Sequence, residues 1–205
     1  MTKPAPIARV DAGVLNPAVS RRVLLAYGGA LGLARFAAAA PLAGTDPLVS
    51  LIELMRQRLD LMVEVARSKW NTGSAVEDLA REQSLADDVA RLAPSYGINP
   101  QLAATFFRAQ IEAAKLVESA LIARWALAHA GAFVDAADQR AVLRPKIDRL
   151  TAELLPALAA VAPALKREDA ERILEAGRLS DEVMALAMTR ALQPLLELCG
   201  VKAGG

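Results

Sequence analysis

The sequence predicts an all-α protein of about six helices that follows a separate N-terminal segment. Alanine and leucine dominate the 205 residues, of which 54% are hydrophobic and only 4% aromatic, and this composition favours helix. No stretch alternates apolar and polar residues as a half-buried strand does. Two dipeptides, Asp46-Pro47 and Asn99-Pro100, join a good N-cap residue to a proline at the first helical position.

The helix boundaries follow from cap and breaker residues in chain order. The first helix is expected to start at the Asp46 cap and to end before Gly73. The second is expected to start at Ser74, which forms a capping box with Glu77, and Pro156 is expected to kink the fourth. The expected helices span about residues 47–70, 74–93, 99–130, 136–161, 167–176 and 180–198. No repeat or linker divides residues 44–205, so they are expected to form one helical domain.

Residues 1–43 have the features of an export signal. Ser20-Arg21-Arg22 precedes an apolar run to about Ala40 that glycines interrupt. A positive head, an apolar middle and a small-residue end are typical of export signals, and the paired arginines resemble a twin-arginine signal. The run is too short and too weakly apolar for a stable membrane span. We expect cleavage between residues 37 and 43 and a periplasmic or secreted product; the alternative is an amphipathic first helix that stays attached.

Charge and residue counts exclude several classes of function. The first forty residues carry a formal net charge of +4, so the rest of the chain, whose total is +1, carries −3. A mildly acidic body has no general attraction for nucleic acid. A single cysteine, Cys199, excludes an intramolecular disulfide and a multi-cysteine metal site. A single histidine, His129, argues against a zinc or Ser-His site, so we expect neither a metal nor a nucleic-acid partner.

Two cations interrupt an apolar stripe of the first predicted helix. Spacings of three and four place six residues on one helical face: Leu51, Met55, Arg58, Met62, Val65 and Lys69. Arg58 and Lys69 therefore point the same way, roughly 16 Å apart along the helix axis. Burying this stripe without a partner for each cation costs several kcal/mol. A dianionic small molecule bound between the two cations is one solution.

A cluster of charged residues follows on the second predicted helix. Asp78, Arg81, Glu82 and Leu85 share a face at spacings of three and four. Arginine offers planar bidentate donors that fit a carboxylate, so Arg81 is a candidate for anion binding. The alternative is a solvated helix surface with ion pairs inside the helix, which is the commoner origin of such a pattern.

One carboxylate lies within an apolar row of the third predicted helix. The row consists of Phe107, Ile111, Ala114, Glu118, Leu121 and Trp125. A carboxylate in such surroundings tends to have a raised pKa, so Glu118 would hold a proton and donate a hydrogen bond. The alternative is a structural ion pair of Glu118 with Arg58 or Lys69.

The order and spacing of these residues resemble a known family. The chain contains, in this order, Arg58-Leu59, Lys69-Trp70, Asp78-x-x-Arg81-Glu82 and Phe106-Phe107-x-x-Gln110-Ile111-x-x-x-x-x-x-Glu118. No nucleophile–base pair and no glycine-rich phosphate loop accompany them. The ordered set resembles the helical chorismate mutases. The export signal and the long C-terminal half are similar to their secreted gamma subclass.

The resemblance implies conversion of chorismate to prephenate, a step of phenylalanine and tyrosine biosynthesis. The reaction is a Claisen rearrangement that needs no cofactor and no covalent intermediate. By the same resemblance, Arg58 and Arg81 bind substrate carboxylates, and Lys69 donates to the ether oxygen as negative charge grows there. Protonated Glu118 donates to that oxygen from the other side.

The resemblance extends to further residues and to assembly. Asp78 and Glu82 would hold the substrate hydroxyl or orient the cations. Leu143-Arg144-x-x-Ile147-Asp148 resembles the family segment that supplies another carboxylate-binding arginine, so Arg144 takes that role. The family also implies a homodimer in which each subunit carries its own site.

The chain departs from the family at several positions. Ala114 stands at a substrate-binding position where members often carry a hydroxyl or amide residue, and Leu85 replaces a polar residue of some relatives. Many helical mutases have glutamine where Glu118 stands, and Cys199 alone cannot form the disulfide found in some secreted relatives.

Two other functions remain open on the sequence. The first is a non-catalytic exported helical bundle that binds a partner or a small anion, with its cations paired internally. The second keeps the site but eliminates pyruvate from isochorismate. Helical lyases of that kind are short chains, whereas this chain has a large second half.

Overall fold

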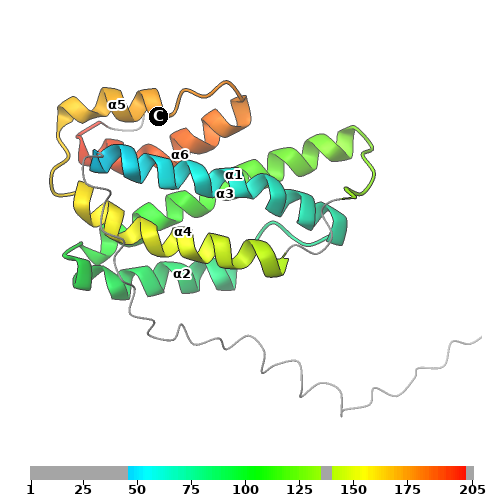
Figure 1. Cartoon of the computed structure of the whole chain (residues 1–205), viewed down its shortest axis with the longest axis horizontal. Coiled ribbons are helices and arrows are strands. Elements are labelled where there is room, and N and C mark those ends of the chain that lie inside the picture. The colour runs from blue at the N-terminus through cyan, green and yellow to red at the C-terminus, as the bar shows by residue number, and fades with distance from the viewer. Residues whose placement is uncertain (1–45, 135–139, 202–205) are drawn as a thin grey trace, which may run out of the picture. The chain divides into compact units, whose positions relative to one another are not determined.

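The computed structural model describes residues 46–134 and 140–201, and every regular element in those ranges is helical (Figure 1). The all-α prediction is therefore confirmed. The α-helices are α1 (Pro47–Thr72), α2 (Leu79–Leu92), α3 (Pro100–Leu127), α4 (Arg140–Val161), α5 (Ala170–Ala176) and α6 (Glu182–Leu198), with short 3-10 turns at Ala93–Tyr96 and Arg167–Asp169.

The expected caps of α1 and α3 are present. The Asp46 carboxylate accepts from the Leu48 backbone N–H at 2.8 Å, and the Asn99 side chain accepts from the Gln101 backbone N–H at 2.8 Å. Gly73 ends α1 in the left-handed region, at φ 65°. These contacts satisfy backbone groups that a helix end leaves without partners.

The prediction for the start of α2 is wrong. We expected Ser74 to cap this helix, but α2 begins at Leu79 with Asp78 as its N-cap. The Asp78 side chain accepts from the Arg81 backbone N–H at 3.1 Å, and the Glu82 side chain accepts from the Asp78 backbone N–H at 3.3 Å. These reciprocal contacts satisfy the first turn of α2 better than the predicted cap, so residues 74–78 form a loop.

Helix α3 packs against α1, α2 and α6, and α1 also packs against α4 (Figure 1). The largest fully buried side chains at these contacts include Phe106 and Phe107 of α3, Leu51 and Met55 of α1, and Leu192 of α6. Burial of such side chains stabilises each by about 1.5–3 kcal/mol relative to exposure. The packing fixes α1 and α3 as rigid neighbours.

Aromatic contacts lock the C-terminal ends of α1 and α3 together. The rings of Trp70 and Trp125 lie edge to face with centroids 6.1 Å apart, and Phe133 lies 4.7 Å from Trp125. The Asn71 side chain bonds both the carbonyl and the N–H of Phe133, each at 2.8 Å. The end of α1 that carries Lys69 is thereby held against α3.

The C-terminal helices also match their predicted positions. Helix α4 runs through Pro145 and Pro156, and its expected start near residue 136 lies outside the described residues. Cys199 follows α6 and is only 4% exposed, and burial raises the pKa of its thiol. Within the described ranges, no helix is long and apolar enough to cross a membrane. The predicted signal, residues 1–43, and its boundary lie outside those ranges.

Candidate active site

Lys69 and Glu118 meet between the end of α1 and the middle of α3. Lys69 Nζ lies 2.6 Å from Glu118 Oε2, and it also donates to the backbone carbonyl of Val76 at 2.9 Å. The ammonium group is therefore held between α3 and the loop that leads to α2. This is one of the two pairings that the sequence left open for Glu118.

Burial controls the protonation of Glu118. The residue is 5% exposed, and this burial raises its pKa above the ordinary glutamate value. The hydrogen bond and charge of Lys69, and the charge of Arg58, act in the opposite direction, while the charge of Glu82 adds to the rise. The expected direction of the shift is confirmed, and its cause is desolvation of the carboxylate.

Arg58 is buried about three helical turns before Lys69 along α1. It is 6% exposed, and its Nη1 donates to the backbone carbonyl of Gln110 at 2.9 Å. Burial lowers its pKa to about 10, against the opposing charge of Glu118, so the group stays cationic at neutral pH. Its Nε is buried and has no hydrogen-bond partner in the described part of the chain.

The contacts of Arg58 and Lys69 also give the direction of the helices. Arg58 touches Gln110 and Lys69 touches Glu118, so α1 and α3 run the same way, and α2 returns between them in the chain. Gln110 is 1% exposed and donates through Nε2 to the Ala191 carbonyl of α6 at 3.0 Å. No role was predicted for Gln110 from the sequence, although an amide among apolar neighbours indicates a buried polar contact.

Arg81 and Arg144 are joined by one carboxylate. Arg81 Nη2 lies 3.3 Å from Asp148 Oδ1, and Arg144 Nε lies 3.2 Å from Asp148 Oδ2. The contact connects α2 to α4 and brings together two arginines that are 63 positions apart in the sequence. Both are more exposed than Arg58, with 36% of the Arg81 side chain and 54% of the Arg144 side chain accessible.

The acidic residues of the second predicted helix separate in the structure. Asp78 is an exposed cap residue and does not lie on an inward helical face, which corrects the predicted row. Its carboxylate meets the backbone N–H of Arg81 and not the guanidinium, because the cap geometry directs it along the helix axis. Glu82 is only partly exposed, and its Oε2 lies 3.3 Å from Lys115 Nζ of α3.

Lys115 is a further cation that the sequence did not single out. Besides Glu82, it pairs with Glu77 at 3.4 Å and Glu112 at 3.3 Å. Burial lowers its pKa, but the hydrogen bonds and charges of Glu112 and Glu82 outweigh that effect, so its pKa is raised. The pair with Glu112 follows from helical spacing, because Glu112 stands one turn before Lys115. The pair with Glu82 does not, because it depends on how α2 packs on α3.

Ala114 lies one turn before Glu118 on α3 and is 6% exposed. Its methyl group has no polar atom, so the position contributes shape but no hydrogen bond. Leu85 is partly exposed on α2. The candidate site therefore takes its polar groups from α1, α2, α3 and α4, as the four cations and Glu118 indicate. Across the described ranges, no group of three or more His, Cys, Asp or Glu residues is placed to hold a metal ion.

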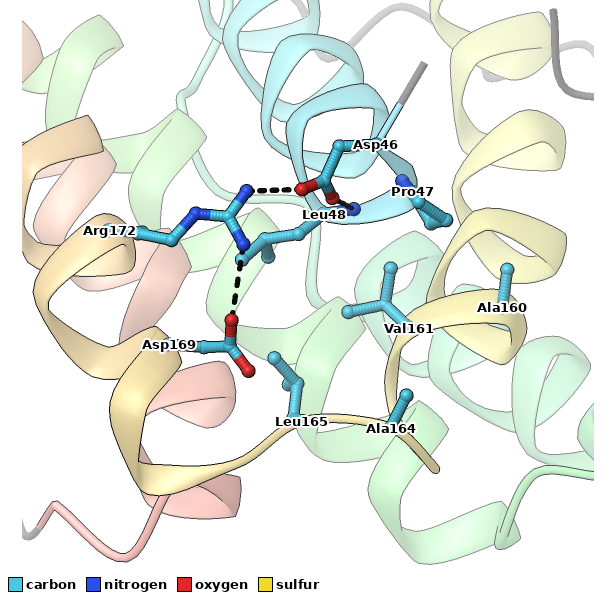
Figure 2. Close-up of a pocket in the computed structure, with 9 residues that line it drawn as sticks. All are labelled: Asp46, Pro47, Leu48, Ala160, Val161, Ala164, Leu165, Asp169 and Arg172. Carbon is cyan, nitrogen blue, oxygen red and sulfur yellow. Dashed lines mark hydrogen bonds and ion pairs between the residues drawn. The ribbon is translucent and has the colours of Figure 1, made fainter. Parts of the chain in front are cut away.

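A cavity of about 160 Å³ lies at the other end of α1 (Figure 2). Arg172 of α5 pairs there with Asp46 and with Asp169, the latter at 3.1 Å. Asp46 and Lys69 stand 23 residues apart on one helix, which corresponds to roughly 35 Å. None of the predicted site residues lines this cavity, and its charged groups satisfy one another.

Comparisons with known proteins identify the family. A family model described as chorismate mutase type II matches residues 49–119. The chain is 36% identical over 135 residues to a secreted chorismate mutase of Mycolicibacterium smegmatis, covering 64% of this chain and 74% of that protein. This chain belongs to the chorismate mutase family.

Other relatives extend the similarity. A secreted chorismate mutase of Mycobacterium tuberculosis is 29% identical over 189 residues, covering 87% of this chain and 91% of that protein. The crystal structure of a chorismate mutase from Burkholderia thailandensis superposes with a TM-score of 0.66 at 35% identity, over 73% of this chain and 98% of that one. A Burkholderia phymatum chorismate mutase gives a TM-score of 0.66 at 30% identity, over 73% of this chain and 96% of that one.

The segment that matches the chorismate mutase type II model contains nearly all of α1, all of α2 and most of α3. It therefore includes Arg58, Lys69, Arg81 and Glu118, whereas Arg144 lies beyond it. The structural contact through Asp148 is what links Arg144 to the other candidates.

The contact between Lys69 and Glu118 predicts a measurable shift. Lys69→Met removes the charge that lowers the pKa of Glu118, so burial and Glu82 act with less opposition and the pKa rises further. A ¹³C titration of glutamate side-chain carboxyls by NMR, assigned with Glu118→Gln, measures the change. Lys166→Met is the matched control, because the Lys166 side chain is exposed and its ammonium pairs with Glu168. An unchanged Glu118 titration in Lys69→Met would contradict the described electrostatics.

Proposed function

We propose that this chain is a chorismate mutase that converts chorismate to prephenate by a cofactor-free Claisen rearrangement, as in phenylalanine and tyrosine biosynthesis. The observation that carries the proposal is the buried Lys69–Glu118 pair beside buried Arg58, within the segment that matches the family model. A pericyclic reaction needs a fixed substrate conformation and stabilisation of separating charge, and preset cations on rigid helices supply both.

Each candidate residue takes a distinct role in this proposal. Arg58 binds a substrate carboxylate from the interior, and Arg81 and Arg144 bind carboxylate from the more exposed side. Lys69 donates to the ether oxygen as the carbon–oxygen bond breaks. Its ammonium is already held by Val76 and Glu118, so little reorganisation is needed when charge develops.

Glu118 acts in this proposal as a hydrogen-bond donor to the same oxygen. In the structure its carboxylate pairs with Lys69, which favours the ionised form, although burial keeps its pKa raised. A dianionic substrate adds negative charge next to Glu118 and favours the protonated form further. Substrate binding and proton uptake by Glu118 are therefore linked.

Asp78 and Glu82 support the site from α2. Asp78 caps the helix and so sets the position of Arg81, while Glu82, paired with Lys115, faces the Glu118 charge. In this proposal Glu82 holds the substrate hydroxyl and Asp78 orients Arg81. Ala114 contributes only apolar surface.

The non-catalytic alternative required Arg58, Lys69 and Arg81 all to pair with acidic residues, with no cavity left between them. The expected partners were Glu118, Asp78 and Glu82. Lys69 meets that condition, but Arg58 bonds a backbone carbonyl and Arg81 bonds Asp148. Two of the three cations thus remain outside the predicted internal pairs, which supports the enzymatic proposal. Product analysis distinguishes the proposed rearrangement of chorismate from the elimination of pyruvate from isochorismate.

Removal of the Lys69 ammonium is expected to lower kcat by about 10²–10³, the scale for losing one donor to developing charge. The variant is Lys69→Ala, and the measurement is chorismate consumption with prephenate formation and no added metal or nucleotide. Lys166→Ala, at an exposed site, is the control, and circular dichroism checks that the helices are retained. Wild-type turnover by Lys69→Ala would reject the assigned role.

The activity is expected to fall as pH rises through the pKa of Glu118, because only the protonated carboxyl donates. The measurement covers about pH 4 to 8, which brackets the ordinary glutamate value of about 4.3 and raised values. Since kcat reports the substrate complex and kcat/KM the free enzyme, the fall in kcat should lie at higher pH. Glu118→Gln donates at every pH and should abolish the fall; a flat wild-type profile would contradict the role of Glu118.

We also propose that the chain is exported, that the twin-arginine-like signal directs it to the periplasm or outside the cell, and that it forms a homodimer. Two relatives are named secreted chorismate mutases, which supports export. The paired arginines at positions 21 and 22 support the twin-arginine route. Replacing both with lysine should leave the protein inside the cell.

The proposed homodimer has a separate test. Light scattering of the purified chain should give twice the monomer mass; a monomer mass would exclude the dimer.

A further inference from the structure

Asp148 divides its two carboxylate oxygens between arginines of two different helices. Oδ1 lies 3.3 Å from Arg81 Nη2 of α2, and Oδ2 lies 3.2 Å from Arg144 Nε, which stands one turn earlier on α4. Both arginines are ones that the proposed function assigns to a substrate carboxylate. A single protein carboxylate thus stands between the two groups that are expected to receive a carboxylate from the substrate.

The contacts of Asp148 are of the kind that breaks easily. The side chains of Asp148, Arg81 and Arg144 are 52%, 36% and 54% exposed, and ion pairs in such surroundings contribute little to stability. The Lys69–Glu118 pair is the opposite case, because the Glu118 side chain is 6% exposed and the distance is 2.6 Å. Separating Asp148 from its arginines is therefore far easier than separating Glu118 from Lys69.

We propose that Asp148 occupies, in the unliganded protein, the place of a substrate carboxylate, and that substrate binding exchanges one carboxylate for the other on Arg81 and Arg144. The inference rests on the proposed function and deepens it. Asp148 acts through the two arginines: it holds them close together while the site is empty, and it competes with the substrate for them. The exchange also breaks the ionic contact between α2 and α4.

The exchange hypothesis makes a different prediction from a purely structural tether. If Asp148 only positioned the arginines, its loss would disperse them and weaken substrate binding. If Asp148 competes with substrate, its loss frees both arginines and strengthens binding. The sign of the change in KM therefore separates the two roles.

The test is Asp148→Asn, which keeps the size of the side chain and removes its charge. In steady-state chorismate turnover we expect KM to fall about threefold, the scale set by weak exposed ion pairs, with a smaller change in kcat. A KM that rises or stays at the wild-type value would overturn the exchange and leave Asp148 as a tether.

A matched control separates competition from a general effect of charge. Glu77→Gln removes one negative charge from the loop before α2, where Glu77 is 65% exposed and pairs with Lys115, not with an arginine. We expect its KM to stay at the wild-type value. An equal fall in KM in Glu77→Gln and Asp148→Asn would overturn the inference, because loss of charge alone would then account for it.

A second readout keeps this inference distinct from the proposed reaction. Succinate carries two carboxylates but no bond that can rearrange, and its binding is measured by calorimetry. We expect Asp148→Asn to bind succinate more tightly than the wild type does, and equal affinities would count against the exchange. If the wild type does not turn over chorismate, the proposed function fails, while the succinate comparison still decides whether Asp148 competes with a dicarboxylate.

Discussion

The buried contact between Lys69 and Glu118 is the interaction on which the arrangement of the other charged groups depends. Removing two charges from water is costly, so a buried ion pair adds little to stability, and losing one partner destabilises strongly. The helix ends that carry this pair are also joined by the ring contact of Trp70 with Trp125 and by the hydrogen bonds of Asn71 with Phe133. These contacts hold the ends of α1 and α3 together, so the position of Lys69 is set by packing rather than by its own flexible stem.

The charged groups of the proposed site differ widely in exposure. Arg58 and Glu118 are buried, Lys69, Glu82 and Arg81 are partly accessible, and Arg144 is exposed. Electrostatic interactions are strongest where water is excluded, and exposed charges act mainly by attracting an ion from solution. This range of exposure suits an anionic ligand that the more exposed Arg81 and Arg144 attract and that the buried groups stabilise.

The sequence predicted the helices well where a strong cap or a glycine marked an end, as at Asp46, Asn99 and Gly73. It failed at α2 because Ser74 and Asp78 both have the spacing of a cap, and the reciprocal contacts of Asp78 and Glu82 that decide between them are seen only in the structure. Helical periodicity also predicted that Arg58, Lys69 and Glu118 face inward, since each row lies on one element. A charge in an apolar row stands out without any tertiary information.

Contacts between elements were not accessible in the same way. The pairing of Arg81 with Asp148 joins positions 67 apart, and that of Lys115 with Glu82 joins positions 33 apart. Spacing within one helix says nothing about such pairs, which depend on the crossing of α2 with α3 and α4. The partner of Gln110 could not be predicted for the same reason. Gln110 donates to the Ala191 carbonyl, which belongs to α6.

The shielded thiol at the end of α6 has a consequence for the oxidising conditions that the proposed export implies. A cysteine reacts as its thiolate, and both the inaccessibility of Cys199 and its raised pKa suppress that form. Two folded copies therefore have little tendency to cross-link through it under oxidising conditions. The chain also gains no covalent restraint from its surroundings, so the domain must keep its shape by helix packing alone.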